Sequence, residues 1–225
     1  MNTIPSAQTG AAPVLNVAAT RVGTRALGPG LRSVVWVQGC PFHCAGCLAP
    51  DWIPDRPARR AHPADLAAEL LADPRVSGLT LSGGEPMQQA KGLAALVRAA
   101  RAERDVTVVC FTGHRLERLR ERPDTADLLA LTDVLIDGQY VARLDDGRGL
   151  RGSSNQRVHH LTPRLAACGY DFDNRPRTAE ITVDGPEALL VGVPPPGVLA
   201  AFDAAVTAVR SPRATPAPPA PRQPT

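Results

Sequence analysis

Four short apolar runs alternate with helical segments through the middle of the chain, and this alternation most constrains the fold. The runs are Ser33–Gln38, Leu79–Leu81, Val106–Phe111 and Asp133–Ile136. Short buried strands that are each separated by a helix imply a parallel sheet with right-handed crossovers. The sequence therefore predicts an α/β fold, either a doubly wound sheet or part of a (β/α) barrel.

The intervals between the runs have helical patterns. Pro63 stands at an early helix position, and Gln88–Ala102 places leucines and valines on one face. Arg115–Leu131 is expected to form two helices broken at Pro123. Two further strands and a closing helix are expected at Ala179–Val183, Leu189–Val193 and Val198–Val209.

The composition of the two ends sets the domain boundaries. Residues 1–13 are small and polar, and residues 211–225 (SPRATPAPPAPRQPT) are Pro-rich with almost nothing to bury. We therefore expect a disordered N-terminus, one domain over residues 14–210, and a disordered tail.

Charge and hydropathy exclude several classes of partner. The formal net charge is only +3 and the basic residues are scattered, so nucleic acid is not an expected partner. No run approaches the length of a membrane span, and the N-terminus has no apolar signal region. Five cysteines, three of them clustered, argue against a secreted disulfide framework. We expect a cytoplasmic protein with no membrane partner.

The clustered cysteines are Cys40, Cys44 and Cys47, in the stretch GCPFHCAGC directly after the first run. Three thiolates around one site suit zinc or an iron–sulfur cluster. Stable structural sites usually have four ligands, so three thiolates on a [4Fe–4S] cluster leave one iron open for an exogenous ligand.

Polar or Gly-rich segments also follow the other three runs. They are Ser82–Pro86, Thr112–His114 and Asp137–Gln139. Because the carboxyl ends of parallel strands lie at one edge, where ligands bind, all four segments are expected to converge on one pocket.

Within these segments, individual residues suggest ligand contacts. Gly83 and Gly84 lack side chains, so their carbonyls can approach a ligand ammonium closely, and Glu85 adds a negative charge for that ammonium. Thr112 and Asp137 at strand ends can bind ligand hydroxyls or can cap their turns, and the sequence does not separate these roles.

The spacing Cys40-x3-Cys44-x2-Cys47, followed by Gly-Gly-Glu-Pro after the next strand, resembles the radical S-adenosylmethionine superfamily. The resemblance is greatest to the activating enzymes of glycyl radical enzymes, particularly the anaerobic ribonucleotide reductase branch. The further segments that carry it are LGPGLR at 27–32, Trp52, DVLIDG at 133–138 and RGSSNQR at 151–157.

This resemblance implies an incomplete (β/α) barrel and one [4Fe–4S] cluster on the three cysteines. It implies that S-adenosylmethionine chelates the open iron and is cleaved to a 5′-deoxyadenosyl radical by an electron from the cluster. The radical would abstract hydrogen from a glycine of a partner enzyme, and the electron would come from a flavodoxin- or ferredoxin-type donor. The implied cofactor-binding residues are Gly83, Gly84, Glu85, Thr112, Asp137 and Asn155.

Two positions depart from wider patterns. Gly46 stands where the superfamily prefers an aromatic residue before the third cysteine, which leaves the cluster less shielded. Gln139 stands where relatives that activate pyruvate formate-lyase have a lysine, which removes a cation for the cofactor carboxylate.

Other interpretations remain open at the level of sequence. The cysteines also fit a Cys3His zinc site with His43, a thioredoxin-like pair, or an electron carrier that recruits Cys110 or Cys168. A radical enzyme that tailors a peptide or small molecule is a further alternative.

Three smaller features also have purely structural interpretations. Residues 153–155 are expected to cap a helix that begins at Gln156, and His159-His160 is expected to be a solvated pair. Trp52 either lies over the cluster or packs the cysteine loop.

Overall fold

The computed structural model describes residues 13–184 and 187–210, and its centre is a mixed sheet of seven strands. The strand order is β3-β1-β2-β4-β5-β6-β7. Its strands are β1 (Leu15–Thr24), β2 (Arg32–Val37), β3 (Arg59–Ala61), β4 (Gly78–Gly83), β5 (Thr107–Thr112), β6 (Val134–Asp137) and β7 (Arg157–His160). The four central strands, β2, β4, β5 and β6, are parallel, and the outer three pair antiparallel. The predicted α/β class with a parallel sheet is therefore confirmed.

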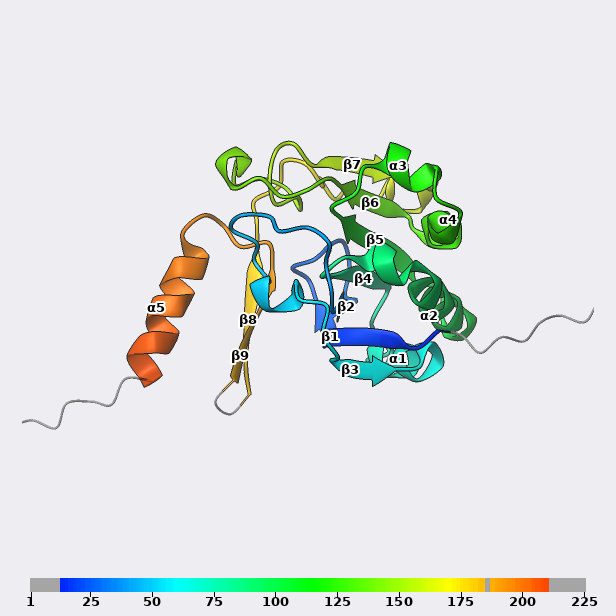
Figure 1. The fold of residues 1–225 in the computed structure, drawn as a ribbon, viewed down its shortest axis with the longest axis horizontal. Helices are drawn as coiled ribbons and strands as arrows, with labels where there is room; N and C mark the ends of the chain where they lie inside the picture. Colours follow the sequence, from blue (N-terminus) through cyan, green and yellow to red (C-terminus); the bar gives the residue numbers. More distant parts are fainter. Residues whose placement is uncertain (1–12, 185–186, 211–225) are drawn as a thin grey trace, which may run out of the picture.

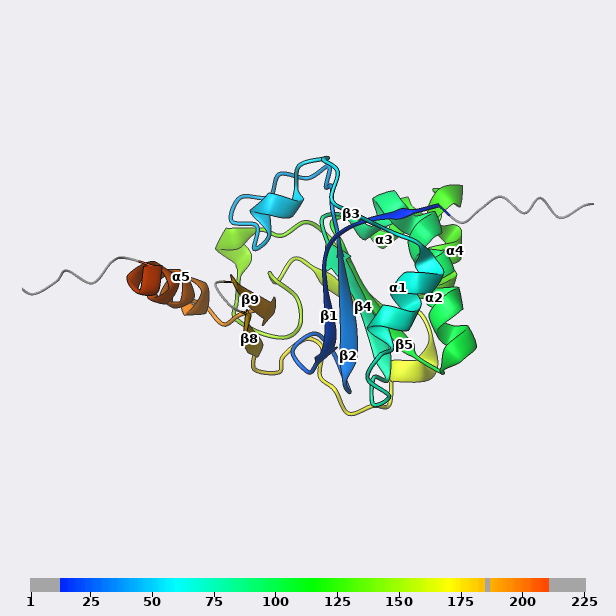
Figure 2. The ribbon, with the colours of Figure 1, turned by 90° about the horizontal axis from the view of Figure 1, so that it is seen from below.

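Helices cover one face of this sheet (Figures 1 and 2). They are α1 (Pro63–Leu70), α2 (Ala90–Glu103), α3 (Leu116–Arg120) and α4 (Ala126–Leu131). The apolar face of α2 buries Leu93, Leu96 and Val97 completely against the sheet. A short 3-10 helix at Pro123–Thr125 separates α3 from α4, so the predicted break is confirmed.

The other face of the sheet carries a second apolar core. Val34, Trp36 and Ile136 point to this side, where they pack with Leu150, Phe172 and Val191 from later parts of the chain. Further short 3-10 helices lie at Pro50–Trp52, Pro86–Gln89, Ala142–Leu144 and Pro163–Leu165.

The last described elements form a separate hairpin and helix. β8 (Ala179–Asp184) and β9 (Glu187–Gly192) pair antiparallel, and α5 (Val198–Arg210) follows. Both predicted strands and the closing helix are confirmed. In Figure 1 the hairpin lies between α5 and the central sheet. No helix among the described residues is long and apolar enough to cross a membrane.

Three parts of the sheet differ from expectation. β1 and the short edge strand β3 were not predicted. The helix expected from Gln156 is wrong, because Arg157–His160 is the edge strand β7 paired with β6. The expected disordered tail and all but the last residue of the expected N-terminal segment lie outside the described residues.

Candidate active site

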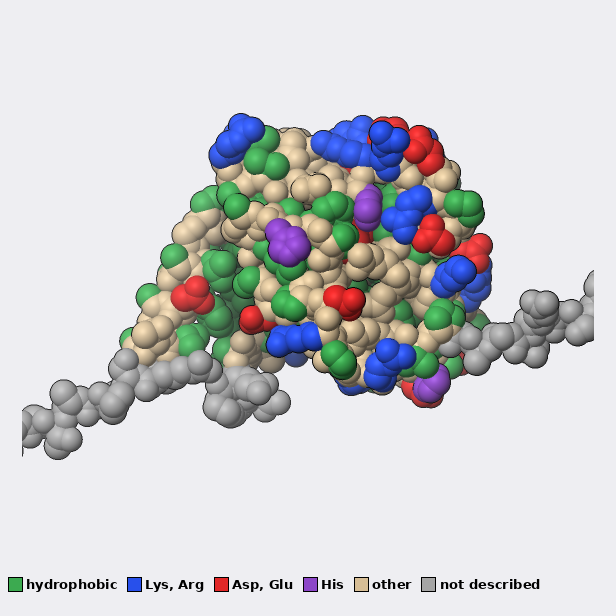
Figure 3. Space-filling model, viewed as in Figure 1, with side chains coloured by type: hydrophobic (Ala, Val, Ile, Leu, Met, Phe, Trp, Pro, Cys, Tyr) green, Lys and Arg blue, Asp and Glu red, His purple; other side chains and the backbone are tan. Residues whose placement is uncertain are grey.

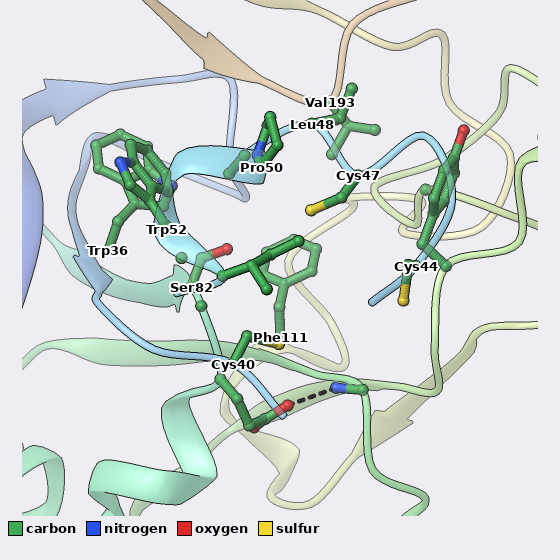
Figure 4. A pocket seen from close by; sticks show the side chains of 18 of the residues that line it. Trp36, Cys40, Cys44, Cys47, Leu48, Pro50, Trp52, Ser82, Phe111 and Val193 are labelled. Atoms are coloured by element: carbon green, nitrogen blue, oxygen red, sulfur yellow. Dashed lines mark hydrogen bonds between the residues drawn. The ribbon is translucent and has the colours of Figure 1, made fainter. Parts of the chain in front are cut away.

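A cavity of about 510 Å³ lies at the carboxyl edge of the parallel strands. Segments that follow β2, β4, β5 and β6 all contribute to its wall, as the sequence predicts for this edge. The lining residues among those singled out in the sequence are Cys40, Cys44, Cys47, Trp52, Gly83, Gly84, Glu85, Thr112 and Gln139. Figure 4 shows the three cysteines around this space.

The cysteine loop is fixed to the next turn of chain by backbone hydrogen bonds. Gly39 N–H donates to Trp52 O and Cys40 N–H donates to Ile53 O, both at 2.9 Å. The Trp52 ring packs on Trp36, with ring centroids 5.5 Å apart, and also lines the cavity. Trp52 therefore packs the loop and faces the cavity at once.

The three thiols are partly buried and face the same cavity. Within the described part of the chain, no three Cys, His, Asp or Glu side chains are placed to hold a single metal ion. A [4Fe–4S] cluster bonds each thiolate to a different iron, so it does not require three sulfurs around one ion. The donor set of three thiols on one cavity fits such a cluster better than it fits a lone zinc ion.

Burial favours the protonated form of two of these thiols, Cys40 and Cys44. It raises the pKa of the Cys40 thiol to about 11. It also raises the pKa of Cys44, although the backbone N–H of Tyr140 acts in the opposite direction. Because iron binds the thiolate, loading the site must release protons.

The alternative fourth ligands lie elsewhere. Cys110 is fully buried in the core beneath the helices, and Cys168 is exposed with its thiol near Leu165 O. His43 is exposed and is not among the residues that line the cavity. None of the three residues is placed to complete a four-ligand site with the cysteines.

Glu85 is fully buried, and neutral donors hold its carboxylate. It accepts hydrogen bonds from Met87 N, Thr112 Oγ1 and Gly113 N, each at 2.8 Å. Burial raises the pKa of Glu85, and these hydrogen bonds only partly oppose the effect. Among the described residues that line the cavity there is no Lys, Arg or His, so no cation in the wall compensates this carboxylate.

The two glycines before Glu85 are required by a close approach of backbone. A side chain at Gly84 would meet Gly39 O at 2.2 Å, and one at Gly83 would meet Val37 N at 2.4 Å. Gly84 N–H donates to Val37 O and Glu85 N–H donates to Gly39 O. The pair therefore packs the end of β4 directly against the start of the cysteine loop.

Tyr140 lies beside Gly46, the position at which the sequence suggested that the cluster lacks an aromatic shield. A Cβ at Gly46 would be 3.5 Å from the Tyr140 ring, and one at Gly152 would be 3.0 Å from it. The ring is thus packed between these two glycines, and it lines the cavity. An aromatic ring from a later segment therefore lies beside position 46, where the sequence itself supplies none.

Asp137 is placed behind the cavity wall. It is fully buried, and it accepts hydrogen bonds from Leu116 N at the start of α3, from Arg115 and from Arg157. Burial alone would raise its pKa, but the bonds from Arg157 and Leu116 and the nearby His159 outweigh it and lower the pKa to about 2. His159 Nε2 lies 3.1 Å from Asp137 Oδ2, so the prediction of a solvated pair is wrong for His159.

Asn155 likewise is not among the lining residues. Its amide donates to Gln139 O at 2.9 Å, and its oxygen accepts from Ser153 Oγ at 2.8 Å. The neighbouring Gln156 does line the cavity, and its amide donates to Gly138 O at 2.7 Å. The sequence indicated this segment through RGSSNQR but did not single out Gln156.

The far wall of the cavity comes from the C-terminal elements, which the sequence did not connect with the site. These lining residues are Ala188, Leu189, Leu190, Gly192, Val193, Leu199 and Phe202. All are apolar or glycine. No motif marked them, because apolar side chains on a strand and helix look the same whether they face a core or a cavity.

Comparisons with known proteins agree with this geometry. Residues 26–159 match the family described as a 4Fe-4S single cluster domain. The anaerobic ribonucleoside-triphosphate reductase-activating protein of Salmonella typhi is 37% identical over 145 residues, which are 60% of this chain and 91% of the relative. The protein of the same name from Enterobacteria phage T4 is 31% identical over 144 residues, 58% of this chain and 85% of the relative. The pyruvate formate-lyase-activating enzyme of Staphylococcus aureus strain USA300 is 38% identical over 68 residues, 28% of this chain and 27% of that enzyme.

Proposed function

The chain belongs to the 4Fe-4S single cluster domain family, in the branch of the anaerobic ribonucleoside-triphosphate reductase-activating proteins, and from that membership we propose that it activates a glycyl radical enzyme. The resemblance inferred from the cysteine spacing and the Gly-Gly-Glu-Pro segment is confirmed. The proposed reaction is the abstraction of a hydrogen atom from a glycine of the partner protein.

The observation that carries the proposal is the shared cavity of three thiols and one uncompensated carboxylate. Cys40, Cys44 and Cys47 would hold a [4Fe–4S] cluster, and Glu85 lies on the same wall as Gly83 and Gly84. When bound, the cluster and S-adenosylmethionine supply a one-electron cleavage that yields a carbon radical.

The protein's own residues bind and orient the cofactor. Three hydrogen bonds from neutral donors hold the Glu85 carboxylate in place. Because these donors carry no charge, they leave its negative charge available to pair with the ammonium of S-adenosylmethionine. No cation among the described lining residues meets the cofactor carboxylate, so neutral donors such as the Gln139 and Gln156 amides would take that place. Thr112 positions Glu85 by a hydrogen bond, and Asn155 positions the backbone of Gln139 in the same way. Asp137 holds the start of α3 beside the loop after β6.

The remaining parts of the proposal concern the fold and the surroundings. We regard the sheet as an incomplete (β/α) barrel, because among the described residues it does not close and ends in the edge strands β3 and β7. The cytoplasmic location that we propose is compatible with the free thiols of the five cysteines. A flavodoxin- or ferredoxin-type electron donor is proposed from the family resemblance alone.

The test is anaerobic incubation of the reconstituted protein with S-adenosylmethionine, a reductant and the glycyl radical enzyme from the same genome. Electron paramagnetic resonance should show a glycyl doublet that disappears when Cys40, Cys44 or Cys47 is replaced by Ser. Cleavage of S-adenosylmethionine without any glycyl signal would contradict activation and favour the tailoring of a peptide or small molecule.

A further inference from the structure

The C-terminal elements lie outside the family match but form part of the site. The match ends at residue 159, whereas β9 and α5 together supply the far wall of the cavity. This chain therefore adds apolar surface beside the cysteine loop that the matched region of its family does not provide.

The hairpin presents one apolar strip that runs from its exposed end to the cavity. In the antiparallel register Val183 pairs with Ala188 and Ile181 pairs with Leu190, so these four side chains share one face. Ala188 and Leu190 line the cavity, while Ile181 and Val183 are 53% and 70% exposed. The opposite face of β9 packs Val191 into the core beside the sheet, which anchors the hairpin.

Exposed apolar side chains of this size are rare in the described structure. Among the described residues, the exposed large hydrophobic side chains are Ile181, Val183 and Leu48. Leu48 belongs to the cysteine loop and lines the same cavity. Contiguous exposed apolar patches mark sites of interaction with other macromolecules.

α5 faces this strip with a second apolar surface. Leu199, Phe202 and Val206 have the spacing of one helix face, and the first two line the cavity. Figure 3 shows hydrophobic side chains in the hollow between α5, at the left, and the rest of the molecule. We call this hollow, between α5 and the Ile181–Val183 face of the hairpin, the C-terminal groove.

A buried arginine fixes the hairpin relative to the cofactor side of the cavity. Arg177, just before β8, forms an ion pair with Asp145 at 2.7 Å and is 1% exposed at its side chain. It also donates to Arg151 O and Gly152 O, and Gly152 lines the cavity. These contacts therefore fix the position of the groove relative to the cavity into which it opens.

We propose that the C-terminal groove binds an uncharged, apolar segment of the protein substrate and leads it to the cavity beside the cysteines. This inference rests on the proposed function. Among the described residues, the side chains named above as forming the groove carry no charge, and no cation lines the cavity, so a nucleotide or another polyanion would find no counter-ion there. An apolar peptide segment covers the strip without losing any charge interaction.

The test places a charge in the groove, away from the cavity wall. Ile181→Glu and Val206→Glu each put a carboxylate into the groove, and Ala204→Glu puts one on the opposite, exposed face of α5 as a matched control. Binding of each reconstituted protein to the purified glycyl radical enzyme is measured by biolayer interferometry. Cluster content, and S-adenosylmethionine cleavage without the partner, are measured on the same samples.

We expect both groove variants to bind the partner about tenfold more weakly or worse, because a carboxylate buried against apolar surface is costly. The control should bind within about twofold of wild type, and cofactor cleavage should be unchanged in all three. Unchanged partner binding by both groove variants, or an equal loss in the control, overturns the inference about the groove. In that case glycyl radical formation by wild type still supports the proposed function.

A wild-type dimer that both groove variants dissociate also overturns the inference about the groove, because a second copy would then occupy the groove. Wild type that cleaves the cofactor but neither binds nor activates the partner overturns the proposed function and this inference together.

Discussion

Glu85 and Asp137 occupy equivalent positions in two regions of the sheet but have opposite surroundings. Each carboxylate stands at the carboxyl end of a parallel strand, and each is fully buried. Neutral donors surround Glu85, and its pKa is raised by burial. Two arginines and a histidine surround Asp137, and its pKa is lowered to about 2.

The difference separates a binding role from a structural role at the same edge. The charge of Asp137 is already balanced, and its hydrogen bonds hold α3 and β7 to the end of β6. The charge of Glu85 is not balanced by any described side chain in the cavity wall, so a cationic ligand gains most by binding there. The predictions below test this contrast, beginning with the largest effect.

The proposed difference between a cofactor-binding Glu85 and a structural Asp137 requires that the cysteine loop beside Glu85 holds the cluster. Replacing Cys40, Cys44 or Cys47 by Ser should abolish the cluster of about four irons and four sulfides in anaerobically reconstituted protein, because each loss leaves an iron without a thiolate. Iron and sulfide analysis with the absorption spectrum is the measurement. Cys110→Ser and Cys168→Ser are the controls, and loss of the cluster in either would point to a four-thiolate electron carrier.

The second prediction addresses Glu85 directly. Glu85→Ala should weaken S-adenosylmethionine binding by about tenfold to a hundredfold at unchanged cluster content, because a buried charge-assisted hydrogen bond is lost, typically about 1.5–3 kcal/mol. Equilibrium binding to the reconstituted protein gives this value. Asp51→Asn is the matched control, since Asp51 also lines the cavity but is exposed and screened by water. An equal loss in both variants would mean that only the total charge of the cavity matters.

The third prediction concerns Asp137 and acid stability. Its pKa falls from 3.8 to about 2 on folding, so its contribution is fully present above about pH 4 and is lost as the pH falls toward 2. The contribution is on the order of 2 kcal/mol of unfolding free energy. Asp137→Asn should therefore destabilise the cluster-free protein near neutral pH, and the difference from wild type should shrink on acidification.

Urea unfolding at several pH values measures this difference. A constant difference at all pH values would contradict the ion-paired role of Asp137. A hundredfold loss of cofactor affinity in a folded Asp137→Asn protein would remove the contrast with Glu85.

The smallest expected effect is at Asn155. Asn155→Ala removes its hydrogen bonds to Gln139 O and Ser153, so we expect a loss of about 1 kcal/mol in stability and only a few-fold change in cofactor affinity. Thermal unfolding and cofactor titration check the two values. A loss of affinity as large as that of Glu85→Ala would make Asn155 a direct cofactor ligand.

The sequence was most informative where burial is complete. β2, β4, β5 and β6 were predicted because each contains a short run of mostly apolar and mostly buried side chains, as a parallel sheet covered on both faces requires. β1 was missed because most of its residues are only half-buried, so no continuous apolar run marks it. β7 was missed because Arg157 and its two histidines suggest a polar segment, although the partner of Arg157, the fully buried Asp137, lies twenty positions earlier.

The candidate site divides in the same way. The cysteine loop and Ser82–Pro86 carry their chemistry in local spacing, so sequence alone brought them to one cavity. Neither the balance of charge around Asp137 nor the C-terminal wall is visible locally. Both depend on contacts between segments far apart in the chain, such as Arg177 with Asp145.

The most direct test of the central claim, that three thiolates leave one iron open for the cofactor, is Mössbauer spectroscopy of the iron-57 cluster before and after S-adenosylmethionine is added. The account predicts that one of the four irons acquires distinct parameters when the cofactor binds to wild type, and that the same concentration has a much smaller effect on Glu85→Ala. Four irons that stay unchanged at saturating cofactor in wild-type protein would contradict it.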